Sequence, residues 1–176
     1  CAHFVKAPNQ EIALLAEWEE KLSKLTEATI NENITNINGV PSWMMVLFKH
    51  ILKTTGKNNI LEVWPNLELF IHGGVSFAPY KEQFEKLIPS STMQYMEVYN
   101  ASEGFFAIQD SSDRKDMLLM LDYGVFYEFI PFEELEEENP KAYTIEEVEM
   151  GKNYAMVIST NGGLWRYMIG DTVQFT

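Results

Sequence analysis

The sequence is poor in residues that form covalent or metal cross-links. Its 176 residues include a single cysteine, Cys1, and three histidines. One cysteine excludes an intrachain disulfide and a thiolate zinc cage, and it fits a reducing compartment, so we expect a cytoplasmic protein. The histidines, His3, His50 and His72, lack the spacing of metal ligands, and we expect them on the surface or in packing contacts.

Basic residues are also scarce. The chain has 13 Lys and Arg residues against 26 Asp and Glu residues, and its formal net charge is -13. This field repels phosphate backbones and anionic bilayers, so we expect no nucleic-acid partner and no membrane partner. A small anion can still bind locally, because backbone amides, a helix N-terminus or a bound cation can reverse the potential inside a pocket.

Long apolar runs are missing as well. The best candidate, Trp43–Phe48, is stopped by Lys49 and falls far short of the roughly 20 residues that a membrane span requires. Hydrophobic residues nevertheless make up 46% of the chain and aromatic residues 13%. This length and composition allow one packed domain and are not typical of a disordered segment.

Two segments near the N-terminus have helical periodicity. From Gln10 to about Thr29, apolar residues recur every three or four positions, and Asn9 is suited to cap a helix there. The stretch PSWMMVLFKHILKTTGK starts with Pro41, which fits the first helical position, and Gly56 should end this second helix. Because the second helix is apolar nearly all round, we expect it to be buried. Its aromatic and methionine stripe is more typical of core than of a pocket wall.

The rest of the chain consists mainly of short segments with strand character. LELFIHGG predicts a strand that runs into paired glycines, and PYKEQFEKLI has helical spacing. Further strands are predicted at MQYMEVYN, FFAIQD, MLLML, GVFYEFIPF and DTVQFT. Between YAMVIST and LWRYMI, the pair Asn161-Gly162 predicts a hairpin, and the acidic run from Glu133 to Glu138 predicts a solvated loop. The order of elements indicates the α/β class, with a mixed β-sheet and flanking helices.

Three polar stretches with glycine interrupt these strands. They are HGGVSFAPY from His72, YNASEG from Tyr99 and RYMIGD from Arg166, each predicted at a strand end. Ligands of open α/β sheets bind outside the carboxyl ends of strands, so the three stretches can line one crevice. The first also precedes a helix N-terminus, which favours an anion. Taken singly, each stretch is more often an ordinary turn or cap.

Five motifs are similar, in order and at compatible separations, to the auxin-responsive promoter family of plants and its bacterial relatives. They are GVPSWMMVLFKHIL, GGVSFAPY, YNASEGFFAIQ, YEFIPFEE and GLWRYMIGDTV, between about Gly39 and Thr176. Members of that family are acyl acid amido synthetases of the adenylate-forming superfamily, which includes luciferase and acyl-CoA ligases. Five ordered matches are more specific than any one short motif.

The resemblance implies a site for ATP and Mg²⁺. It makes Tyr99 the ring against adenine and Ser102 a hydroxyl near the α-phosphate. Glu103 becomes the Mg²⁺ ligand, and with Ser102 it forms the catalytic set. A carboxylate suits Mg²⁺, which prefers one or two carboxylates plus phosphate oxygens. Asp171 matches the residue that accepts hydrogen bonds from the ribose hydroxyls, a task that suits paired carboxylate oxygens.

The glycine loop and Met168 depart from the pattern of the plant members. Gly73 and Gly74 would let the backbone approach the nucleotide closely, which a β-carbon would obstruct, although this glycine loop is longer than that of the plant members. Met168 stands where the plant members commonly carry an arginine. A methionine cannot donate to a phosphate or a carboxylate, so that role is not transferred, while Arg166 remains.

The resemblance also implies that the chain is a central fragment of the large N-terminal domain of an adenylate-forming enzyme. The Ser/Thr/Gly-rich phosphate loop and the mobile C-terminal domain would lie outside it. The implied activity is ATP-dependent activation of a small carboxylic acid and transfer of the acyl group to an amine such as an amino acid, with the fragment inactive alone. An acyl-CoA ligase with the same adenylation step remains an alternative, as does a noncatalytic acidic interaction domain.

Overall fold

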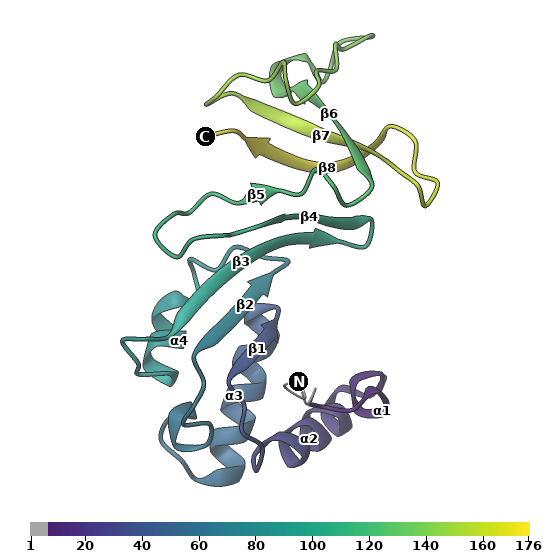
Figure 1. Ribbon diagram of the computed structural model, residues 1–176. Coiled ribbons are helices and arrows are strands. Elements are labelled where there is room, and N and C mark those ends of the chain that lie inside the picture. The colour runs from purple at the N-terminus through teal and green to yellow at the C-terminus, as the bar shows by residue number, and fades with distance from the viewer. Residues whose placement is uncertain (1–6) are drawn as a thin grey trace. The chain divides into compact units, whose positions relative to one another are not determined.

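The computed structural model describes residues 7–176, so Cys1 and His3 lie outside the described residues. The chain divides into two compact units (Figure 1). The first runs to Val98 and also contains Gln109–Asp113, and the second contains Tyr99–Ile108 and Arg114–Thr176. Within the described part of the chain, no helix is both long and apolar enough to cross a bilayer.

The first unit is built on parallel strands. Strand β1 (Asn36–Gly39) pairs with β2 (Leu69–Gly73), and β2 pairs with β3 (Gln94–Ala101), whose last residues enter the second unit. Parallel neighbours need crossover connections. Along the chain, helix α3 (Pro41–Thr55) and the 3-10 turn η1 (Ile60–Glu62) connect β1 to β2, and helix α4 (Lys81–Leu87) connects β2 to β3. Figure 1 shows α3 and α4 beside these strands.

Aromatic rings form the core of this unit. Phe84 of α4 stacks on Phe70 of β2 with ring centroids 4.9 Å apart, and Phe48 of α3 meets Phe84 edge-on at 5.6 Å. All three rings are fully buried. The indole N–H of Trp64 donates to the Thr29 carbonyl at 2.9 Å, which ties the N-terminal helices to the same core.

The single helix predicted from Gln10 to Thr29 is wrong, because the structure has two helices there. These are α1 (Gln10–Ala13) and α2 (Trp18–Thr29). The predicted cap is confirmed, since Asn9 Oδ1 accepts from the Ile12 amide at 3.0 Å. The carbonyl of Ala13 accepts from the Lys21 ammonium at 2.6 Å, in a side-chain contact across the break. Side-chain periodicity reports a shared face, and it does not detect an interruption of the backbone ladder.

Helix α3 has the predicted limits, with Pro41 in its first turn and Gly56 as a left-handed C-cap at φ 68°. The expectation of full burial is wrong. Met45, Phe48 and Ile51 are buried, whereas Trp43 is 61% exposed. Trp43 packs against Trp18 of α2 at 5.6 Å, so this face of α3 meets a surface helix rather than the core.

The second unit is antiparallel. Strand β4 (Gly104–Ile108) pairs with the short β5 (Leu118–Leu119). Strands β6 (Val125–Pro131), β7 (Asn153–Thr160) and β8 (Tyr167–Gln174) form a three-stranded sheet in that order. Its core comprises Phe106, Tyr127, Phe129, Tyr154, Met156 and Ile158. Parallel and antiparallel pairing with flanking helices confirms the predicted mixed α/β class.

The Asn161-Gly162 hairpin is confirmed, because β7 and β8 pair antiparallel on either side of it. The prediction of DTVQFT as a separate last strand is wrong, since β8 is continuous from Tyr167 to Gln174. Strand β8 continues through Gly170, which has a positive φ of 96°. The pairing of β7 with β8 has an irregularity between Ala155 and Val157, and such an irregularity lets a strand bend without ending. The acidic run follows β6 as the 3-10 turn η2 (Phe132–Glu134) and exposed turns, as predicted.

Candidate functional site

Two predicted nucleotide-binding side chains, Tyr99 and Asp171, meet within the second unit. The phenol of Tyr99, near the end of β3, donates to Asp171 Oδ2 on β8 at 2.5 Å. The two residues are 72 positions apart in the sequence. Folding therefore brings together the ring expected against adenine and the carboxylate expected at the ribose.

The Tyr99 ring is held by aromatic neighbours. Its centroid lies 5.1 Å from that of Phe106, which is fully buried in β4, and Phe106 in turn meets Tyr127 edge-on at 6.4 Å. Burial raises the pKa of Tyr99 well above its ordinary value, and the hydrogen bond and charge of Asp171 raise it further. The phenol is therefore a protonated, fixed donor.

Ser102 and Glu103 form the turn between β3 and β4. Ser102 is exposed and Glu103 is partly buried. The negative charge of Glu103 also raises the pKa of Tyr99, which places this carboxylate within electrostatic reach of the phenol. Gly104 begins β4, and a β-carbon there would come within 3.1 Å of the Phe106 ring. The turn after β3 thus holds Glu103 within electrostatic reach of the Tyr99 phenol.

The donor set fits a magnesium nucleotide. Within residues 7–176, no three His, Cys, Asp or Glu side chains are grouped as a complete protein metal site. Mg²⁺ in nucleotide sites takes one or two carboxylates and completes its shell with phosphate oxygens and water. The Glu103 carboxylate is a ligand of the kind that such coordination uses, and its role as a Mg²⁺ ligand stays a prediction.

Gly73 and Gly74 lie in the first unit, at the end of β2. Gly73 is opposite Val98 in the β2–β3 register, and Val98 precedes Tyr99 in the chain. Gly74 has φ 80°, a left-handed conformation that favours glycine, and a β-carbon there would lie 3.4 Å from Val40. The conformation explains this glycine, and the approach of a nucleotide to the pair stays a prediction.

His72, which opens the same stretch, is a packing residue, as expected. It is 2% exposed and stacks on Phe77 with ring centroids 4.2 Å apart. Its Nδ1 has no hydrogen-bond partner among the described residues. Burial lowers the pKa of His72 from 6.5 to about 4, so the ring is neutral at pH 7.

The third stretch, RYMIGD, does not lie at a strand end as predicted. Most of it is inside β8, because pairing with β7 continues past Met168. Arg166 has φ 46°, and its Nε donates to Glu128 Oε2 at 3.0 Å. Its backbone amide donates to the Ser159 hydroxyl at 2.9 Å. Arg166 therefore anchors the start of β8 in this structure, and Met168 is 47% exposed beside it.

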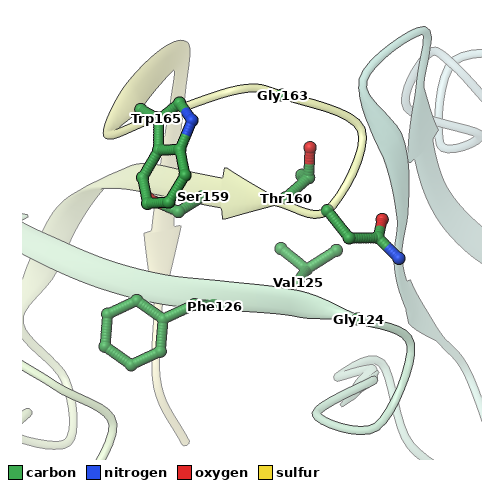
Figure 2. Close-up of a pocket in the computed structure, with 8 residues that line it drawn as sticks. Gly124, Val125, Phe126, Ser159, Thr160, Gly163 and Trp165 are labelled. Carbon is green, nitrogen blue, oxygen red and sulfur yellow. The ribbon is translucent and has the colours of Figure 1, made fainter.

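A hollow of about 670 Å³ in the second unit was missed by sequence reasoning (Figure 2). It is lined by Gly124, Val125, Phe126, Ser159, Thr160, Asn161, Gly163 and Trp165. None of the predicted site residues lines it. Trp165, 83% exposed, and Phe126 lie toward one side, and Thr160 and Gly163 toward the other. The Trp in the segment after Asn161-Gly162 was the signal available, since an aromatic next to a hairpin turn often stays exposed.

Two family models match the chain. The GH3 family N-terminal domain matches residues 1–93, and the GH3 family central domain matches residues 118–176. Asp171 falls in the second match, whereas Tyr99, Ser102 and Glu103 fall between the two. The roles of these last three residues stay predictions that rest on the YNASEG motif.

Curated and solved relatives agree with these matches. An indole-3-acetic acid-amido synthetase, GH3.3 of Arabidopsis thaliana, is 27% identical over 166 residues, which is 88% of this chain and 27% of that protein. The chain thus spans about a quarter of the length of that relative. The structure of the GH3.15 acyl acid amido synthetase superposes with a TM-score of 0.68 at 14% identity, covering 93% of this chain and 38% of that one.

A second solved structure with a similar fold is that of an acyl-CoA ligase. The open conformation of 2-hydroxyisobutyryl-CoA ligase superposes with a TM-score of 0.64 at 14% identity, and it covers 90% of this chain and 33% of that one. At such identity the likeness concerns the fold. The GH3.15 acyl acid amido synthetase and 2-hydroxyisobutyryl-CoA ligase therefore both have the fold of this chain.

Proposed function

Since the chain belongs to the GH3 family, we propose that the complete gene product activates a carboxylic acid with ATP and transfers the acyl group to an amine. In this proposal the chain is a central part of the adenylate-forming domain, with the phosphate loop and the mobile domain outside it. The observation that carries the proposal is the hydrogen bond between Tyr99 and Asp171 beside the Glu103 turn. A small carboxylic acid and an amino acid or other amine are the proposed substrates, and the cytoplasm is the proposed location.

Each side chain of the pair has a part in holding ATP. The Tyr99 ring packs against adenine, and the Asp171 carboxylate accepts hydrogen bonds from the ribose hydroxyls. Asp171 is exposed and can be reached by a ligand, while Tyr99 is backed by Phe106. Binding energy at base and sugar then positions the triphosphate relative to the acid.

The turn residues act at the phosphates. The exposed hydroxyl of Ser102 donates to an oxygen of the α-phosphate, and Glu103 holds Mg²⁺. The ion supplies neutralisation of the triphosphate charge. Attack of the substrate carboxylate on the α-phosphorus releases pyrophosphate, and attack of the amine on the acyl carbon then releases AMP. No protein nucleophile takes part, so the residues act by positioning and charge stabilisation.

The test is exchange of labelled pyrophosphate into ATP by the complete gene product, across a panel of carboxylic acids. We expect acid-dependent exchange that falls at least about 100-fold in Glu103→Gln, because the metal ligand is lost while the size is kept. Glu136→Gln is the matched control, since it removes the same charge from the exposed acidic run. Unchanged exchange in Glu103→Gln contradicts the role of this carboxylate.

An acyl-CoA ligase is the second candidate, and the fold likeness to 2-hydroxyisobutyryl-CoA ligase favours it. Both activities share the adenylation step and differ in the acceptor. Two assays of the complete gene product with ATP and a carboxylic acid distinguish the two activities. One assay contains a mixture of amino acids as acceptors, and the other contains CoA. Amide product with no thioester supports the amido synthetase, and the reverse result supports the ligase.

A further inference from the structure

We infer that Tyr99 acts through its phenol as well as its ring: the hydroxyl fixes the Asp171 carboxylate in the orientation in which it accepts the ribose hydroxyls. The inference rests on the proposed function and adds a positioning task to Tyr99 beyond contact with the base. It makes selection of the nucleotide sugar depend on a residue of a different strand, because Tyr99 is on β3 and Asp171 is on β8.

The geometry leaves room for the sugar. The Tyr99 hydroxyl occupies one acceptor position of Asp171, on Oδ2 at 2.5 Å. An ionised carboxylate has about four such positions, so the ribose diol can bind without displacing the phenol. An exposed aspartate otherwise samples several rotamers, and each loss of rotamer freedom on binding weakens affinity. The phenol removes that freedom before the nucleotide arrives.

Tyr99 is itself fixed, as a positioning residue must be. Its ring rests on Phe106, which is fully buried, and Phe106 meets Tyr127. The Tyr127 hydroxyl donates to the Met120 carbonyl at 3.2 Å, which anchors the far end of this row of rings. The donor that meets Asp171 is thus connected to the core of the second unit.

The charges around the phenol keep it a donor. Asp171 and Glu103 both act on Tyr99 electrostatically, so a phenolate would be a third negative charge in the same place. Burial disfavours the phenolate as well. The hydrogen bond therefore runs from the Tyr99 hydroxyl to the Asp171 carboxylate.

The experiment compares ATP with 3′-deoxyATP in the acid-dependent exchange assay on the complete gene product. Tyr99→Phe keeps the ring and removes the hydroxyl. We expect its KM for ATP to rise about tenfold with kcat changed less than about threefold, because the Asp171 side chain must then be ordered when the nucleotide binds. The preference for ATP over 3′-deoxyATP should fall by a similar factor, because an Asp171 carboxylate that the phenol no longer orients forms a weaker hydrogen bond with the ribose 3′-hydroxyl.

Tyr127→Phe is the matched control, since it removes a phenol oxygen from the same row of rings without touching Asp171. It should lower thermal stability and leave the sugar preference unchanged. Asp171→Asn is the second variant, and adding Tyr99→Phe to it should cost no further preference, because the two groups act as a unit. The preference is a ratio of two kcat/KM values measured on one protein sample, so it remains informative if Tyr99→Phe lowers the folded fraction.

Three results would overturn the inference. An unchanged sugar preference in Tyr99→Phe means that the bond only supports the fold. A lower KM for ATP in that variant means that the phenol competes with the ribose. Absence of acid-dependent exchange in the unmodified protein overturns the proposed function and the inference together, whereas normal exchange with an unchanged preference overturns the inference alone.

Discussion

At the scale of single residues, burial changes the chemistry of His72 most clearly. The sequence assigned it to packing or surface because no second ligand stood at metal spacing, and the packing role is confirmed. The ring lies between Phe70 and Phe77, with Nδ1 unpartnered among the described residues. Neither the burial nor the unpartnered nitrogen follows from a local pattern, because both depend on side chains that the fold supplies.

This burial predicts an acid-sensitive first unit. The unfolded chain binds a proton at His72 below its ordinary pKa of 6.5, whereas the folded chain resists protonation down to about 4. The unfolded state therefore binds more protons in that window, and the free energy of unfolding falls as the pH drops from 6.5 to 4. Urea unfolding across this range should show a loss of stability that is roughly 2 kcal/mol smaller in His72→Phe.

The matched control is His50→Phe, because His50 lies on α3 and is only partly buried. Carboxylates that titrate at lower pH contribute equally to the unmodified chain and to His72→Phe. The difference between their curves of unfolding free energy against pH therefore isolates His72. The same pH slope in His72→Phe and in the unmodified chain would show that the ring is solvated in the native state.

At the scale of elements, sequence reasoning succeeded where a residue type acts on its own neighbourhood. Pro41 and Gly56 mark the limits of α3, and Asn161-Gly162 marks the β7–β8 hairpin. It failed where the outcome depends on a distant partner. The break between α1 and α2 and the continuity of β8 were both missed, because periodicity describes faces and not hydrogen-bond ladders.

Gly56 gives a prediction at this scale. Its φ of 68° is left-handed, and nothing within 4 Å would meet an added β-carbon, so only the backbone conformation resists a side chain. Gly56→Ala should lower the free energy of unfolding by about 1 kcal/mol. Gly162→Ala is the control, since Gly162 has no positive φ and an added β-carbon makes ordinary contact at 3.5 Å. Equal stability of Gly56→Ala and the unmodified chain, measured by urea unfolding, would mean that the helix ends differently.

At the scale of the whole molecule, the two units divide the predicted site. Tyr99, Ser102, Glu103 and Asp171 belong to the second unit, and Gly73 and Gly74 belong to the first. The family resemblance named the residues, and the structure shows a contact between two of them, Tyr99 and Asp171, within the second unit. The expected convergence of all three polar stretches on one crevice stays a prediction.

The proposed function predicts weak nucleotide binding by residues 1–176 alone. In the proposed function the phosphate loop is not part of these residues, and a net charge of -13 opposes a polyanion. Calorimetry with ATP and Mg²⁺ should show a Kd of about 1 mM or weaker. The complete gene product, measured under the same conditions, is the control. Micromolar binding by the 176-residue chain would mean that base and ribose contacts carry most of the affinity.

The sequence by itself determined the class of fold, the limits of α3, the hairpin turn and the family, because each depends on signals that act over a few residues or on motifs in a fixed order. Only the tertiary structure decided that the Tyr99 phenol meets Asp171, that His72 is sealed among aromatic rings, and that Arg166 pairs with Glu128. Such contacts join residues on different strands or in different loops. Their geometry comes from strand register and core packing, which no local pattern encodes.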